Sequence, residues 1–122
     1  MNKRDKTVCK KILRYCDEIE ETHRFFQNDE QKFLDKEQGF IYRNAVTMAV
    51  LQIGELAKRL SDDFLQNHSA IPWRQIIRTR DVYAHHYGSV DYDVLWDTSH
   101  GDINDLKAYL TELVNESSTD ER

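Results

Sequence analysis

Residues that interrupt regular structure are scarce in this chain. Its 122 residues include one proline and four glycines, and glutamate, lysine, leucine and alanine recur, which favours helix over strand. No apolar run approaches the roughly 18 residues that a membrane-spanning helix needs. No apolar segment of a secretion signal follows the first residues, 1–5. We therefore expect a helical, single-domain protein that stays in the cytoplasm and away from membranes.

Cysteine is equally scarce, and the two cysteines are unsuitably spaced for shared chemistry. On one helix, Cys9 and Cys16 would lie roughly 10 Å apart, too far for a disulfide. They also lack the two-residue separation of a redox pair or a zinc half-site. We expect both thiols to be reduced and to lie in the core or at an interface.

Most of the short motifs that mark metal, phosphate or nucleophile sites are missing. The chain has no HExxH, no glycine-rich phosphate loop and no GxSxG. Asp91, Asp93 and Asp97 superficially resemble a calcium loop, but the required glycine and terminal glutamate are absent. The sequence therefore predicts no metal site and no bound cofactor.

An excess of positive charge is absent as well. The formal net charge is −5, whereas general nucleic-acid binders obtain much of their affinity from cationic groups that neutralise phosphate. Any RNA site in this chain must therefore be a local basic patch.

Apolar residues at spacings of three and four predict two long helices in the first half of the chain. The first helix spans 5–26, and a polar connector or a short helix follows at 31–36. The second begins between 35 and 38 and ends near 66. Its expected buried stripe is Ile41, Ala45, Met48, Ala49, Ile53, Leu56, Leu60 and Phe64. Gly54 lies at the centre of this helix, where a close helix crossing is plausible on steric grounds.

Two further helices are predicted in the second half. The third runs from Pro72, a residue favoured at helix starts, to about His86. The fourth spans 92–115, with Asp91 as its N-cap and a bend or interruption at Gly101. Its expected buried side is Val94, Leu95, Ile103, Leu106, Leu110 and Leu113. The result is one all-α domain over residues 1–115, a bundle of four main helices, with a polar and frayed tail at 116–122.

The segment 73–87 concentrates groups that bind phosphate. It holds Arg74, Arg78 and Arg80, two adjacent histidines and two tyrosines, with Asp81 as its single acid. In an acidic chain, this is the one place where an anion such as RNA phosphate would gather, and Arg74 and Arg78 are candidate phosphate contacts. The same residue types are common on ordinary helix surfaces, so the cluster alone leaves a structural role open.

Helical geometry relates the charged groups of this segment. Asp81 and His85 are four residues apart, so the carboxylate can accept a hydrogen bond from the imidazole. Arg80 and His85 lie roughly 140° apart around the helix, so one copy cannot easily aim both at one phosphate. Two copies across a symmetric dimer could.

The order of Arg80, four residues, His85, one residue and Tyr87 matches the motif of HEPN-domain toxins of the HepT type. Three flanking blocks also resemble that family: IGELAKRL, IPWRQII, and VD followed by VLWD. The similarity spans roughly residues 40–113, and the blocks in order make it far more specific than the motif alone.

The resemblance implies a HEPN-type up-and-down bundle that works as a homodimeric, metal-independent endoribonuclease. Arg80 and His85 would be the catalytic pair, supported by Asp81. A ribose 2′-hydroxyl would attack the neighbouring phosphate, giving a cyclic phosphate and a free 5′-hydroxyl. His85 would act as general acid or base, and Arg80 would stabilise the phosphoryl charge.

The resemblance also implies that the chain is the toxin of a type VII-like toxin–antitoxin system. Tyr87 corresponds to the tyrosine to which a partner, an MntA-type minimal nucleotidyltransferase, transfers AMP. A bulky anion on the face of Arg80 would block the phosphate site and neutralise its charge. His86 stands where the family more often has glycine, and it either supports catalysis or has no role.

Three hypotheses remain open from the sequence. The first is a ribonuclease toxin that acts through Arg80 and His85. The second is a non-catalytic HEPN module that docks a nucleotidyltransferase and helps to bind nucleotide or substrate. The third is a purely structural helical dimer, in which Arg80 and His85 can be changed without any growth or binding phenotype. Removal of the His85 imidazole separates the first two, because it abolishes either RNA cleavage or only partner binding.

Overall fold

The computed structural model describes residues 1–120, apart from the side chains of 87 and 118–120. This part of the chain contains six α-helices, one 3-10 turn and no strand, which confirms the predicted all-α class. The elements are α1 (Lys3–Phe25), α2 (Glu30–Leu34), α3 (Phe40–Ala57), α4 (Asp62–Asn67), α5 (Trp73–His85), η1 (Tyr87–Ser89) and α6 (Tyr92–Asp120). Four of the helices are long, as predicted, and α2 is the short helix that the sequence allowed after the first.

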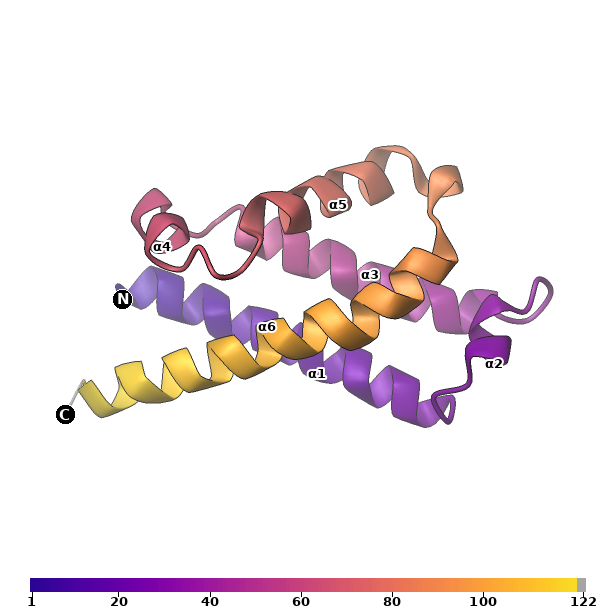
Figure 1. Cartoon of the computed structure of the whole chain (residues 1–122), viewed down its shortest axis with the longest axis horizontal. Coiled ribbons are helices and arrows are strands. Elements are labelled where there is room, and N and C mark those ends of the chain that lie inside the picture. Colours follow the sequence, from indigo (N-terminus) through magenta and orange to yellow (C-terminus); the bar gives the residue numbers. More distant parts are fainter. Residues whose placement is uncertain (121–122) are drawn as a thin grey trace.

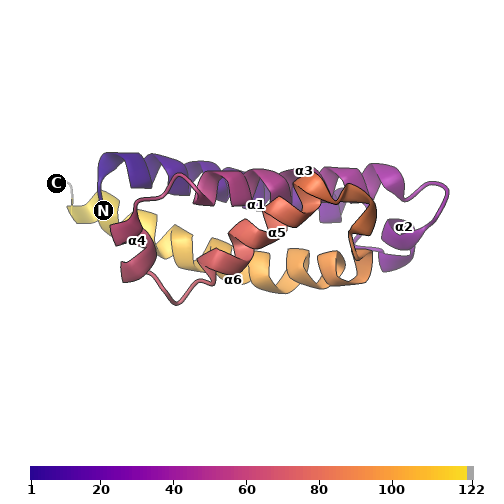
Figure 2. The same cartoon turned by 90° about the horizontal axis from the view of Figure 1, so that it is seen from above.

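The long helices alternate in direction along the chain (Figure 1). α1, α3 and α6 run side by side along the long axis, and α5 lies above them. Seen from above, α5 crosses the axis of the bundle obliquely (Figure 2). α3 packs against both α1 and α5, whereas α6 packs mainly against α1. α5, which carries the basic segment, is therefore held to the bundle chiefly by α3.

The second helix is shorter than predicted, because the chain turns at Ser61. The Ser61 hydroxyl donates to Asp5 Oδ2 at 2.6 Å, and its backbone N–H donates to Asp5 Oδ1 at 2.9 Å. The same hydroxyl accepts from the Phe64 N–H and caps α4. α3 therefore ends at Ala57 and a separate helix covers 62–67, so the continuous helix to 66 was wrong.

The predicted buried stripe of the second helix is also partly wrong. Ile41 and Met48 are 60% and 56% exposed, and Ala45 is exposed as well. The side of α3 that faces the core carries Tyr42, Val46, Ala49, Val50, Ile53, Leu56 and Ala57. Both sets of residues recur at helical spacing, so α3 has one apolar face in the core and a second, weaker one exposed to solvent.

The last helix is longer than predicted and is not interrupted. Asp91 caps it as predicted, since its carboxylate accepts from the N–H groups of Asp93 and Val94. The helix continues through Gly101 without interruption and ends at Asp120 instead of 115. Gly101 has open space around it, and Val94, expected in the core, is 54% exposed. Within residues 1–120, no helix is long and apolar enough to cross a membrane.

The two cysteines lie in the core between the long helices, as expected. Both are free thiols and both are almost completely buried. Burial raises the pKa of each thiol to about 12, with Asp5 adding to the shift at Cys9 and Asp17 at Cys16. These thiols are therefore poor nucleophiles.

A buried polar cluster that the sequence did not reveal joins α1, α3 and α6. His23 is 6% exposed, its Nδ1 is hydrogen-bonded with the Tyr42 hydroxyl, and its Nε2 lies 2.8 Å from the Ser99 hydroxyl. The ring of His100 packs 3.9 Å away, centroid to centroid. Burial, followed by the charge of His100, lowers the pKa of His23 to about 4, so this imidazole is neutral at physiological pH.

Candidate active site

Two aromatic residues fix the basic helix α5 on the bundle. Trp73, 5% exposed, lies in its first turn and donates its indole N–H to the backbone carbonyl of His68 at 2.9 Å. Tyr83, 7% exposed, lies near its end. The helix begins directly after Pro72 and ends at His85, with the His86 N–H donating to the Val82 carbonyl. Its buried side is thus defined by anchors at both ends.

Gly54 of α3 allows α5 to approach closely at Arg80. A Cβ placed on Gly54 would lie 2.2 Å from Cβ and 2.9 Å from Cγ of Arg80, and 3.2 Å from the carbonyl oxygen of Ile76. Any side chain at position 54 would therefore push α5 away. The close crossing predicted at Gly54 is confirmed, and it occurs at the motif arginine.

The guanidinium of Arg80 is held by carboxylates from two helices. Its Nε lies 3.0 Å from Glu55 Oε2 of α3, and its Nη1 lies 3.0 Å from Asp81 Oδ1 of α5. Lys58, the C-cap residue of α3, contacts the same Asp81 oxygen at 2.7 Å. The four side chains alternate in sign, and that of Arg80 keeps 26% of its surface exposed. Arg80 is thus aimed along the α3 side of the helix and still reaches solvent.

Asp81 has partners other than the one expected from helical spacing. The hydrogen bond from Lys58, and then that from Arg80, lowers the pKa of the Asp81 carboxyl. Among the described contacts there is none between Asp81 and His85, so the predicted pairing is replaced by the pairing with Lys58 and Arg80. Asp81 therefore orients the arginine instead of the histidine.

The histidines at the end of α5 face solvent. His85 and His86 are both exposed, and neither side chain forms a hydrogen bond or ion pair within residues 1–120. One copy of the chain brings Arg80 together with Asp81 but does not bring Arg80 into contact with His85. This agrees with the angular separation that helical geometry predicts for positions 80 and 85.

Arg74 and Arg78 lie on the outward side of α5. Both are exposed, and no ion pair joins either of them to another described residue. Their spacing of four places them on one face, so they offer two unneutralised cations. Tyr87 begins the 3-10 turn that follows α5 after His86, and its side chain lies outside the described part of the structure.

Glu55 and Lys58 are the site residues that the sequence reasoning missed. Both lie in the block IGELAKRL, but nothing in the sequence linked them to Arg80 or Asp81. The available signal was Gly54, because a glycine in mid-helix marks the crossing at which its neighbours meet the partner helix. Among residues 1–120, no group of three or more His, Cys, Asp or Glu side chains is placed to hold a metal ion.

Comparison with known proteins gives a family for most of the chain. A family model described as ribonuclease HepT-like matches residues 12–113, which include the whole of α5 and the α3 residues that contact it. A protein of Thermococcus cleftensis named as a probable ribonuclease HepT is 44% identical over 69 residues. That alignment covers 57% of this chain and 63% of the relative.

Relatives in Methanocaldococcus jannaschii extend the similarity over the full length. One of them, whose name proposes an RNase, is 31% identical over 121 residues, which cover 95% of this chain and 97% of the relative. For another of the same description, 35% identical, the alignment covers 61% of either chain. The chain thus spans less than two thirds of several relatives that it matches. No solved structure matches it.

Proposed function

Because the chain belongs to the HepT-like ribonuclease family, we propose that it is an RNA-cleaving toxin whose reaction is carried out by Arg80 and His85. The observation that carries this proposal is the arrangement on α5. Arg80 is oriented by Glu55 and Asp81 at a helix crossing that only glycine permits, while the His85 imidazole is exposed and unpartnered. A fixed cation and a free imidazole are the groups that phosphate-ester cleavage requires.

The proposed reaction is an internal transfer at phosphorus. The ribose 2′-oxygen forms a bond to phosphorus as the bond to the 5′-oxygen of the next nucleotide breaks. The products are a 2′,3′-cyclic phosphate and a 5′-hydroxyl. The His85 imidazole accepts the proton from the 2′-hydroxyl and, once protonated, donates a proton to the leaving 5′-oxygen. Arg80 stabilises the charge on the non-bridging oxygens, so the proposed mechanism uses no metal.

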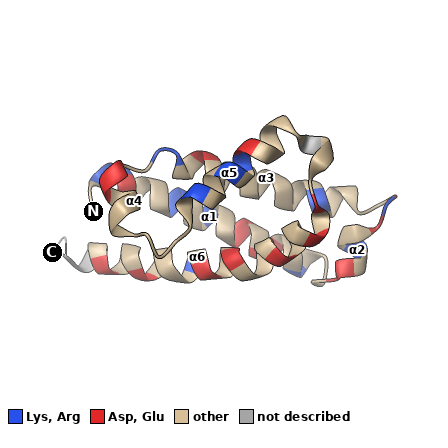
Figure 3. Cartoon of the chain, turned by 45° about the horizontal axis from the view of Figure 1, so that its top comes forward, with Lys and Arg blue, Asp and Glu red and all other residues tan. Residues whose placement is uncertain are grey.

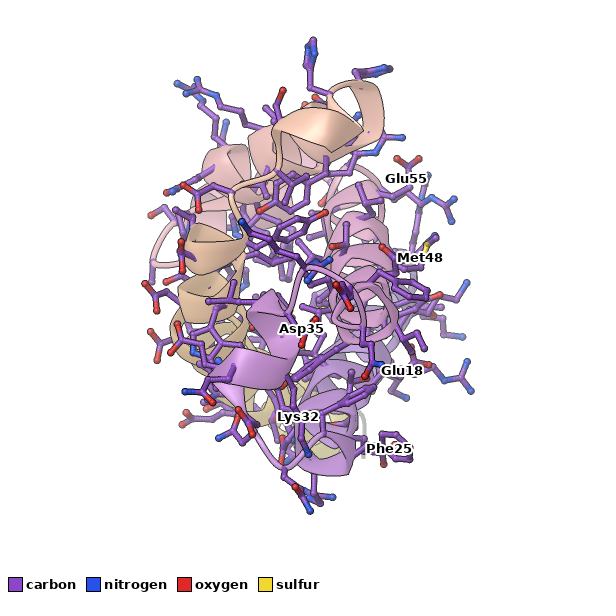
Figure 4. All side chains as sticks on the ribbon, turned by 90° about the vertical axis from the view of Figure 1, so that its right-hand side faces the viewer. Glu18, Phe25, Lys32, Asp35, Met48 and Glu55 are labelled. Atoms are coloured by element: carbon purple, nitrogen blue, oxygen red, sulfur yellow. The ribbon has the colours of Figure 1, made fainter. Side chains whose placement is uncertain are left out.

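Because Arg80 and His85 of one copy lie roughly 140° apart around α5, a site that holds both groups requires two copies of the chain, and the surface offers a place for the second copy. Phe25, Ile41 and Met48 are 80%, 60% and 56% exposed. Met48 and Glu55 of α3 extend from the same side as Glu18 and Phe25 of α1 (Figure 4).

The exposed face of α3 has the spacing of a helix–helix contact. It carries Ile41, Ala45, Met48, Gln52 and Glu55, separated alternately by four and three residues. None of these side chains is fully buried. That repeat is typical of paired helices. Glu55 belongs both to this face and to the Arg80 network. A homodimer formed here would therefore place its two-fold axis beside the catalytic arginines.

Control by a nucleotidyltransferase partner is the second part of the proposal. The Tyr87 phenolic oxygen would attack the α-phosphorus of ATP, form a phosphodiester bond and release pyrophosphate. Tyr87 follows the end of α5 by two residues, so the added adenylate would stand next to His85. Its negative charge would compete with RNA phosphate for the arginines of α5.

One observation favours the alternative of a non-catalytic module that docks a nucleotidyltransferase and helps to bind nucleotide or substrate. Arg80 is already paired with Glu55 and Asp81, so its positive charge is offset before any RNA phosphate reaches it. The two functions differ in whether RNA is cut when His85 is intact.

The test is cleavage of total RNA in EDTA by protein whose intact mass shows Tyr87 to be unmodified. Wild type is compared with His85→Ala and with His86→Ala. The second variant removes the same side chain at the exposed neighbouring position and decides whether His86 supports catalysis or has no role. We expect cleavage by wild type and by His86→Ala, with cyclic phosphate ends, and a loss of at least about a hundredfold in His85→Ala. Absence of cleavage by folded, dimeric wild type would favour the docking module.

A further inference from the structure

A cleft between α5 and α6 extends inward from the surface that carries Arg74 and Arg78. Its outer part has a volume of about 580 Å³ and is lined by both arginines. Its inner part, of about 200 Å³, reaches Val50 and Ile53 of α3. The residues that line both parts are Pro72, Gln75, Thr79, Tyr83 and Val94. The two parts therefore adjoin each other along these residues.

The two walls of this cleft carry opposite charge. Arg74 and Arg78 stand on the α5 side of the outer part, where Asp91 lies on the α6 side, and the exposed Asp102 and Asp105 of α6 border the smaller part. Basic residues on α5 and acidic residues along α6 are visible on the two neighbouring helices (Figure 3). The two arginines outnumber Asp91 in the outer part, and Asp102 and Asp105 repel an anion from the smaller part, so a ligand with a phosphate places it at the arginines.

The size and lining of the inner part fit one planar ring system. Its 200 Å³ is smaller than the roughly 300–1,000 Å³ of sites for drug-sized molecules. Apolar side chains from α3 and the ring of Tyr83 line it, while Thr79, Thr98 and Asp105 supply polar groups. Nucleobases have apolar faces and hydrogen-bonding edges, and unpaired bases are bound in such pockets.

We propose that this cleft is a nucleotide-binding subsite that holds one unpaired base of the RNA strand, with the adjoining phosphate on Arg74 and Arg78. The carboxylates of Asp102 and Asp105 accept from exocyclic amino groups, so adenine, cytosine and guanine are favoured over uracil. The proposal rests on the proposed ribonuclease function, because the strand is the substrate of that reaction.

The cleft lies where a bound strand would be guided toward His85. Arg74, Arg78 and His85 recur at spacings of four and seven on α5, and they therefore lie on one outward face of that helix. Arg78 and His85 are roughly 10 Å apart along the helix axis. A strand anchored by its base in the cleft would run along α5 and present a neighbouring phosphate to the imidazole.

The test measures binding of a fluorescent single-stranded RNA by full-length His85→Ala protein, which cannot cut it under the proposed mechanism. Val94→Trp is introduced to fill the cleft, because Val94 lines both parts and is 54% exposed, so the larger ring need not disturb the core. Thr111→Trp, at an exposed position of α6 outside the cleft, is the matched control. Thermal unfolding followed by circular dichroism verifies that both variants fold.

We expect Val94→Trp to weaken RNA binding roughly tenfold, the scale of one lost base contact, and Thr111→Trp to bind like the parent. With an abasic oligomer of equal length, the effect of Val94→Trp disappears. Arg78→Gln, an exposed substitution that leaves the cleft open, weakens binding of both oligomers. Equal binding by Val94→Trp and its parent, or an equal loss with the abasic oligomer, would overturn the proposal.

A titration with AMP distinguishes the two sources of a nucleotide. If AMP saturates the cleft and the strand does not compete with it, the site takes free mononucleotides and its assignment to RNA is wrong. Failure of wild-type protein to cut RNA contradicts the proposed function and not the binding result. Normal cleavage together with unchanged binding by Val94→Trp contradicts only the subsite.

Discussion

Replacement of Gly54 by alanine adds one methyl group where α3 meets Arg80 of α5, and so tests whether the close contact of these helices positions Arg80. The new Cβ would lie 2.2 Å from Cβ of Arg80, whereas non-bonded carbon atoms prefer separations of about 3.5–4.0 Å. α5 must therefore move away from α3 by about 1.5 Å at Arg80. Overpacking of this kind costs about 1–3 kcal/mol, and the better helix propensity of alanine offsets about 1 kcal/mol of that.

The expected outcome separates stability from activity. Gly54→Ala should lower the free energy of unfolding by about 0–2 kcal/mol, a loss that leaves the protein folded. RNA cleavage should fall on the order of a hundredfold, because a displacement of about 1 Å at a catalytic group is enough for such a loss. Urea unfolding and initial cleavage rates, measured on the same preparations, give both quantities.

Gly101→Ala is the matched control for this experiment. Gly101 also lies within a helix, but no atom stands within 4 Å of its would-be side chain. The substitution should raise the free energy of unfolding by roughly 0.5–1 kcal/mol and leave cleavage unchanged. If Gly54→Ala behaved like Gly101→Ala in both measurements, the close approach of α5 would have no role in positioning Arg80.

Three further predictions concern residues around the site and the core. Lys58→Met removes the contact that contributes most to the low pKa of Asp81, so the acid limb of the pH–rate profile should move to higher pH while the rate at neutral pH changes little. Met48→Glu places a charge on the exposed face of α3; light scattering should show a monomer with lost cleavage, and a dimer of unchanged stability would show that the interface lies elsewhere. His23 has a pKa of about 4 in the folded chain against 6.5 in the unfolded chain. The neutral imidazole therefore contributes fully to the free energy of unfolding above pH 6.5, and this contribution is lost as the pH falls toward 4. Urea unfolding should show a loss of up to ~3 kcal/mol across that window, absent in His23→Gln.

The long helices could be predicted from apolar spacing, because the burial of one stripe per helix dominates their placement. The break at Ser61 could not, since it depends on a hydrogen bond to Asp5, 56 residues away. The buried face of α3 was assigned in part to the wrong side for a related reason. This helix carries two apolar stripes, and the sequence alone does not show which of them faces the core of the chain.

The segment that carries the candidate site could be picked out from the sequence, but the contacts of its side chains could not. The Arg80 motif and the close crossing at Gly54 were both visible as local patterns. The partners of Asp81 were not, because Lys58 comes from another helix and reaches Asp81 only where α3 and α5 cross. The cleft beside Arg78 was likewise invisible, since its walls are separate helices whose spacing no local pattern encodes.

The central claim is that Arg80 of one copy acts together with His85 of another, and mixing of two inactive variants tests it directly. Arg80→Ala and His85→Ala are each purified, combined, exchanged and assayed for RNA cleavage in EDTA beside wild type. A mixed dimer then holds one site with both groups intact and one site with neither, so each mixed dimer should recover about half of the wild-type rate. Verified mixed dimers that remain as inactive as the two parents, beside an active wild type, would contradict a catalytic site shared between copies.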